Sequence, residues 1–115
     1  MTLPAEGKLL RIFIGEADRW HGAPLYQAIV EEARKRGLAG ATAWKAFLGF
    51  GAHSRVHTSA ILRLSTDLPV VIEIVDAAEK IEAFLPVLDG MVQEGLVTLE
   101  RAEILMYRGP RTPRG

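Results

Sequence analysis

The sequence predicts an α+β fold in which a strand–helix–strand unit occurs twice, giving the order βαββαβ. The β-rich run Leu10–Ile14 is followed by a helical segment, by Gly37 and by a second β-rich run. A shift of 58 positions finds the same order again, beginning with the β-rich residues 68–72. The side chains of the two halves differ, so this is a repeat of pattern more than of sequence. Four strands and two helices of this kind form a four-stranded antiparallel sheet with both helices on one face.

The first helix is predicted between Pro24 and Gly37. Proline suits the first turn of a helix, where its missing N–H has no helical partner to lose. Leu25, Ile29 and Ala33 recur at a spacing of four residues and form an apolar stripe. Gly37 follows the basic last turn, in the position where glycine commonly ends a helix.

The second helix is predicted to open at Asp76, with Glu79 three residues later completing a pair that resembles a capping box. Pro86 lies inside the helical pattern and predicts a kink or a restart. Gly95 is predicted to end the helix. Four apolar residues are expected to form its buried stripe: Ile81, Leu85, Leu88 and Val92.

The strands are apolar on both faces. Alternate positions of the first strand carry Leu10, Ile12 and Ile14 on one side and Leu9 and Phe13 on the other. Two helices cover only one face of a four-stranded sheet, so the second face needs another cover, and we expect a homo-oligomer. Trp44 alternates with Thr42 and Ala46, which predicts a place in the core or in a subunit interface.

Composition excludes several classes of protein. Fourteen Lys and Arg residues balance fourteen Asp and Glu residues, whereas a nucleic-acid-binding protein normally has a net basic surface. The absence of cysteine excludes disulfides, thiolate metal sites and cysteine nucleophiles. No apolar run approaches the roughly 18 residues that span a bilayer, and no signal peptide is visible, so we expect a cytoplasmic protein. No nucleophile–base pair or carboxylate dyad has supporting context, and we expect no enzymatic activity.

A long polar segment joins the two halves. Residues 49–59 contain two histidines, an arginine and three hydroxyl side chains, and long polar loops on a rigid sheet often carry function. Gly49-Phe50-Gly51 is too short to be a phosphate-binding fingerprint, and its glycines fit an unusual backbone conformation or a close approach by a ligand. Gly15, Glu16 and Asp18, after the first strand, are interpreted as a turn.

Several motifs occur in an order that resembles domain-of-unknown-function family 190. They are Ile-Gly-Glu-x-Asp (14–18), Pro-Leu-Tyr (24–26), Gly-Leu-Ala-Gly-Ala-Thr (37–42), Gly-Phe-Gly (49–51), Arg-Val-His-Thr (55–58), the run from Ile61 to Asp76, and Glu-Lys-Ile (79–81). The resemblance implies one domain over residues 8–107, with an N-terminal extension at 1–7 and a Pro/Gly/Arg-rich tail at 108–115.

That family is similar to the PII signalling proteins. The resemblance implies a ferredoxin-like subunit, a trimer with its sheets facing inward, and adenine nucleotides bound in clefts between subunits. It also implies that the loop between the second and third strands, here 51–59, contacts ligand or a partner protein. An association with a fluoride-channel family by gene neighbourhood makes a membrane channel a candidate partner.

The ligand-binding residues expected on this basis are Gly49, Phe50, Gly51, Ser54, Arg55, His57, Thr58 and Arg63. One departure from the PII pattern bears on the ligand. The turn at residues 93–98 is short and has no Lys or Arg, whereas PII proteins have a longer loop there with basic residues for the phosphates. AMP is therefore expected in preference to ATP. The cations that could meet a phosphate are Lys45, Arg55, Arg63, Arg101, Arg108 and Arg111.

The leading hypothesis is thus a PII-like regulatory protein that binds a small adenylyl ligand. The alternative is a divalent-metal-responsive trimer of the same fold. His53 and His57 stand four residues apart, a spacing that in a helix presents two imidazoles to one metal. No third ligand is evident from the sequence.

Overall fold

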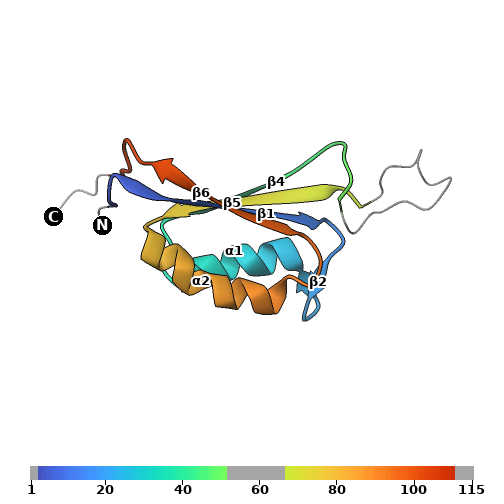
Figure 1. The fold of residues 1–115 in the computed structure, drawn as a ribbon. Coiled ribbons are helices and arrows are strands. Elements are labelled where there is room, and N and C mark those ends of the chain that lie inside the picture. The colour runs from blue at the N-terminus through green and yellow to red at the C-terminus, as the bar shows by residue number, and fades with distance from the viewer. Residues whose placement is uncertain (1–2, 52–66, 111–115) are drawn as a thin grey trace.

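The computed structural model describes residues 3–51 and 67–110, which form a four-stranded antiparallel sheet with two helices on one face (Figure 1). The strands of this sheet, in the spatial order β4-β5-β1-β6, are β4 (Ala41–Lys45), β5 (Pro69–Asp76), β1 (Glu6–Gly15) and β6 (Leu96–Glu103). The helices are α1 (Leu25–Lys35) and α2 (Ala78–Met91). A two-stranded hairpin, β2 (Arg19–Trp20) with β3 (Ala23–Pro24), precedes α1. The predicted βαββαβ order and ferredoxin-like topology are confirmed.

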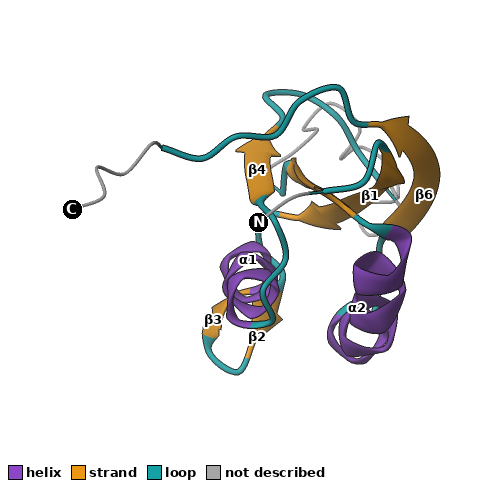
Figure 2. Cartoon of the chain, turned by 90° about the vertical axis from the view of Figure 1, so that its left-hand side faces the viewer, coloured by secondary structure: helices purple, strands orange, loops and turns teal. Residues whose placement is uncertain are grey.

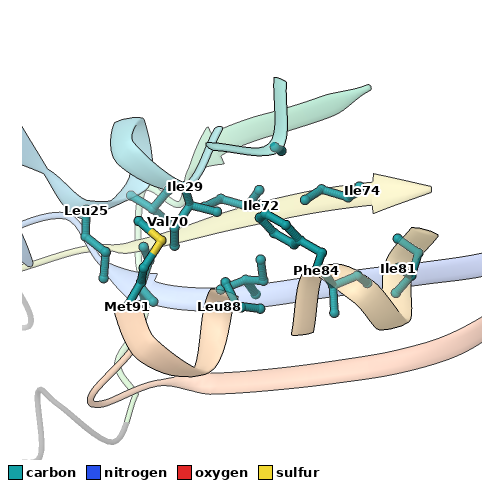
Figure 3. Packing of buried hydrophobic residues seen from close by; sticks show 13 residues of the cluster. Leu25, Ile29, Val70, Ile72, Ile74, Ile81, Phe84, Leu88 and Met91 are labelled. Atoms are coloured by element: carbon teal, nitrogen blue, oxygen red, sulfur yellow. The ribbon is translucent and has the colours of Figure 1, made fainter. Parts of the chain in front are cut away.

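The core lies between the helices and one face of the sheet. In β1 and β5, alternate residues point to this face, and Leu10 and Ile12 of β1 stand opposite Ile74 and Ile72 of β5. All four side chains are fully buried. The helices add the residues that close the core opposite the sheet: Leu25, Ile29 and Ala33 of α1 with Ile81, Phe84, Leu88 and Met91 of α2 (Figure 3). The predicted stripe of α1 is confirmed.

The predicted start of α2 is wrong by one residue. The capping position is Ala77 and not Asp76, the helix begins at Ala78, and no side chain makes a capping bond. Asp76 is instead the last residue of β5 and is 1% exposed. Its carboxylate accepts the N–H of Ala77 at 2.6 Å and the N–H of Ala39 at 2.8 Å. Asp76 therefore ties the beginning of α2 to the connection between α1 and β4.

The buried stripe of α2 also differs from the prediction. Ile81 and Leu88 are buried as expected, but Phe84 and Met91 complete the stripe, while Leu85 and Val92 pack only at the edge of the core. The four buried residues are three, four and three positions apart. This spacing follows the 3.6 residues of a helical turn more closely than a constant spacing of four. The helix runs through Pro86 without a restart and ends at Met91, four residues before Gly95. The predicted end at Gly95 is therefore wrong, whereas Gly37 follows α1 with a φ of 77°, as expected.

The second face of the sheet is not covered by either helix (Figure 2). Its apolar residues include half-buried Val71 and Val75, together with Trp44, which is 49% exposed and so does not belong to the core. In the middle of this face, Arg11 donates from Nε to Glu73 at 2.6 Å, and its Nη1 lies 3.4 Å from Glu100. The hydrogen bond with Glu73 raises the pKa of Arg11, so this guanidinium keeps its charge.

Replacing Asp76 with alanine should destabilise the protein by about 2 kcal/mol, because two buried N–H groups lose a charged acceptor. The free energy of unfolding, measured in urea at fixed protein concentration, tests this. Glu79→Ala is the matched control, since Glu79 is exposed and makes no capping bond. Equal effects of the two substitutions would contradict the role assigned to Asp76.

Candidate functional site

A cavity of about 560 Å³ lies at the end of the sheet where β1 ends and β5 and β6 begin. Its walls come from four separate segments of the chain. The lining residues are Phe13, Ile14, Gly15, Ala46, Phe50, Gly51, Asp67, Pro69, Val71, Glu94, Gly95 and Leu96. The volume falls within the range usual for small-molecule sites, and the walls are mainly apolar.

Two glycines allow close packing in the wall of this cavity, Gly95 against the backbone of Phe13 and Gly15 against the side chain of Asp67. Gly95 has a φ of 154°, and a Cβ at this position would lie 2.6 Å from the carbonyl oxygen of Phe13. A Cβ on Gly15 would lie 2.7 Å from Oδ2 of Asp67. Side chains at either position would displace the neighbouring wall.

Backbone hydrogen bonds fix residues 67–69 against the rest of the site. The N–H of Glu16 donates to the carbonyl of Leu68, and the N–H of Ala46 donates to the carbonyl of Pro69, both at 2.8 Å. The Asp67 carboxylate accepts the N–H of Ala17 at 2.8 Å. The start of β5 is thus joined both to the turn after β1 and to the end of β4.

The predicted turn after β1 is present. Asp18 accepts the N–H of Gly15 at its carboxylate at 3.0 Å, and its own N–H donates to the carbonyl of Gly15 at 3.2 Å. Glu16 accepts a hydrogen bond from Nζ of Lys45 at 3.0 Å. Lys45, one of the cations considered for a phosphate, is therefore paired beside the cavity.

The charged side chains that line the cavity within the described residues are Asp67 and Glu94. Arg101, another of the cations considered, pairs with Glu6 at 3.4 Å on the far part of β6. The described walls thus combine apolar surface with two carboxylates.

Two of the residues predicted from the sequence, Phe50 and Gly51, line this cavity. Gly49, with a φ of 156°, precedes them, and a Cβ on it would lie 3.2 Å from Cγ of Pro69. The other predicted ligand residues fall outside the residues that the structure describes: Ser54, Arg55, His57, Thr58 and Arg63, with His53 of the metal alternative.

Sequence reasoning did not select Asp67, Phe13 or Val71 as site residues. Phe13 lies far from the other two in the chain, so the three residues form no local sequence motif. The signal that was present is the pair Gly15 and Gly95, each at a strand end, where another part of the chain packs closely against the backbone.

Within residues 3–51 and 67–110, no three His, Asp or Glu side chains gather as a metal site. The metal alternative rests on residues outside these ranges and stays a prediction. No helix in the described part of the chain is long and apolar enough to cross a membrane.

Comparison with known families gives a match over residues 7–104 to the model of DUF190, described as an uncharacterized ACR. The chain belongs to the DUF190 family. This DUF190 protein is 42% identical over 98 residues to a UPF0166 protein of Aquifex aeolicus, across 85% of this chain and 92% of that relative. It is 34% identical over 105 residues to a UPF0166 protein of Methanocaldococcus jannaschii, across 90% of this chain and 94% of the relative.

Solved structures with the same fold include CPII of Thiomonas intermedia K12. The structure of CPII bound to ADP and bicarbonate matches with a TM-score of 0.53 and 17% identity, over 86% of this chain and 88% of that chain. A second structure, of CPII as a nitrogen regulatory PII-like protein bound to ADP, AMP and bicarbonate, gives a TM-score of 0.54 and 18% identity at the same coverage. The DUF190 chain thus has the ferredoxin-like fold of a PII-like protein.

Gly95→Ala should destabilise the protein by about 1–3 kcal/mol, because the new Cβ meets the Phe13 carbonyl and the φ of Gly95 is strained for alanine. Gly90→Ala is the control. No atom lies within 4 Å of its added Cβ, and alanine in a helix is favoured over glycine by about 0.5–1 kcal/mol. Thermal melting of both variants tests the contrast. A neutral Gly95→Ala would show that the cavity wall is not closely packed.

Proposed function

We propose that this DUF190 protein is a PII-like regulatory protein that binds an adenine nucleotide in the cavity at the sheet end. The observation that carries the proposal is this cavity, with its apolar walls and its place between β1, β5 and β6. The structures of CPII with ADP and AMP support the choice of ligand, since CPII shares the fold. Regulation, and not catalysis, is proposed because no nucleophile–base pair is evident in the sequence.

AMP is proposed over ATP. The short turn at residues 93–98, which has no Lys or Arg, supports this preference.

Signalling is proposed to pass through residues 51–59. Gly51 lines the cavity at one end of this segment, and Asp67 lines it just beyond residues 52–66. A ligand in the cavity contacts both sides of this connection. Such a ligand changes the populations of the loop's conformations only if it binds one conformation more tightly than another, and the change is limited by that difference in affinity. A regulated protein, with a membrane channel as one candidate, would read that difference.

Replacing Phe50 with alanine should weaken AMP binding about tenfold, because an aromatic wall that can stack on a base is worth about 1–3 kcal/mol. Isothermal titration calorimetry with AMP, ADP and ATP provides the measurement. Phe47→Ala is the matched control: Phe47 is 90% exposed and Phe50 is 72% exposed, but only Phe50 lines the cavity. No binding of any adenine nucleotide to the wild type would end the proposal.

A homotrimer that buries the uncovered sheet face is also proposed. The support is an apolar face with exposed Trp44 and Leu96, and a charged centre whose groups already pair with one another, Arg11 with Glu73 and Glu100. Paired charges can be buried between copies at lower cost than isolated ones.

Trp44→Glu should convert the trimer to monomers at micromolar concentration, because it places an unpaired charge on the proposed interface. Molecular mass from light scattering after gel filtration tests this. Ala83→Glu puts the same charge on the exposed outer surface of α2 and should leave the mass unchanged. A Trp44→Glu protein with the wild-type mass would exclude this face as the interface.

A further inference from the structure

A polar row crosses the uncovered face of the sheet (Figure 2). Arg11 of β1 stands directly opposite Glu73 of β5 and Thr98 of β6. Glu73 in turn stands opposite Thr42 of β4. Residues that are directly opposite on paired strands share a face, so these four side chains lie in one line across the sheet. Glu100 adds a second carboxylate on the same face, two residues further along β6.

Apolar side chains occupy the rows on both sides of this polar row. They are Trp44, Val71, Phe13 and Leu96 on one side, and Val75 and Leu9 on the other. Removing these apolar rows from water favours association with another copy. A copy that covers both apolar rows must also cover the polar row between them.

The charges of this face do not balance. The described strands bring one cation to it, Arg11, and two carboxylates, those of Glu73 and Glu100. The other charged residues of these strands, among them Lys45 and Arg101, share the face of the core residues. Each copy therefore brings one excess negative charge to the proposed interface, whatever the orientation of the copies.

Glu100 is the carboxylate that Arg11 holds less closely. Nε of Arg11 donates to Glu73 at 2.6 Å, whereas Nη1 lies 3.4 Å from Glu100. The side chain of Glu100 is 55% exposed, against 23% for Glu73. Tyr107 and Arg108 follow β6 in the chain but lie toward the opposite edge of the sheet, where the Tyr107 hydroxyl donates to a backbone carbonyl just before β4. Glu100 is thus the acidic group of this face that burial changes most.

We propose that the homotrimer takes up protons at Glu100 as it forms, so that acidification strengthens its association. This inference rests on the proposed trimer that buries the uncovered face. Three copies bring their excess negative charges together in a region with less water, where burial and like charge disfavour the ionised form of a carboxylate. The trimer then binds more protons than three separate chains, and a state that binds more protons is favoured as pH falls.

Analytical ultracentrifugation of the full chain, from nanomolar to micromolar protein, tests this. The concentration at which half of the trimer dissociates should fall about tenfold from about pH 8 to about pH 5. Glu100→Gln should associate at both pH values as tightly as the wild type does at the lower pH, because an amide carries no charge. If the trimer persists at the lowest concentration, exchange of subunits between labelled and unlabelled trimers gives the same comparison and should be about tenfold slower at the lower pH.

Glu103→Gln is the matched control. It removes the same charge from the same strand, but Glu103 stands opposite Glu6 on the other face of the sheet. This variant should keep the pH response of the wild type. A response that is lost equally in both variants would show a general effect of charge and overturn the role of Glu100.

The remaining outcomes separate this inference from the proposed trimer. A wild-type trimer whose association does not change with pH would overturn the role of Glu100 and leave the trimer standing. A pH response that survives in Glu100→Gln would assign the protons to other groups, such as His21, and would also overturn it. A wild type that is monomeric at every pH would overturn this inference together with the proposed trimer.

Discussion

The register of β1 between β5 and β6 is the constraint on which the rest of the structure depends. β1 is bonded on both sides, and Ile12 stands opposite Ile72 on one neighbour and Val97 on the other. A slip of one residue would turn Arg11 into the core and Leu10 out of it. The same register sets Gly15 opposite Pro69 and Phe13 opposite Leu96, and these pairs form the end of the sheet where the cavity lies. The register of β1 therefore determines both which side chains enter the core and which residues meet at the cavity.

The cavity has a consistent chemical character. Its described walls provide apolar surface, close backbone and the carboxylates of Asp67 and Glu94. Among the described residues, Lys45 beside the cavity is paired with Glu16. The proposed preference for AMP rests on the short turn at residues 93–98, which has no Lys or Arg.

The sequence predicted the parts of the fold that depend on local patterns. The stripe of α1 and the glycine after it follow from spacing alone, and both are confirmed. The limits of α2 could not be predicted this way, because Asp76 serves a tertiary contact. It accepts the N–H of Ala39, 37 residues away, where a local reading assigns it to a helix cap.

The sequence predicted only the part of the site whose residues are consecutive in the chain. Phe50 and Gly51 belong to a glycine-containing segment that stands out locally, and both line the cavity. Asp67 and Phe13 reach it through strand pairing over long separations, which composition and spacing do not encode. The sequence did predict a sheet with one face not covered by helices. Apolar residues stand at both odd and even positions of the strands, so neither face of the sheet is polar.

Hydrogen–deuterium exchange with and without AMP tests the central claim, a nucleotide site at this end of the sheet, most directly. The account predicts that AMP slows exchange in residues 46–51 and in the turn at 92–96, and leaves the outer surface of α1 unchanged. Slower exchange confined to the helices, or no change at saturating AMP, would contradict it.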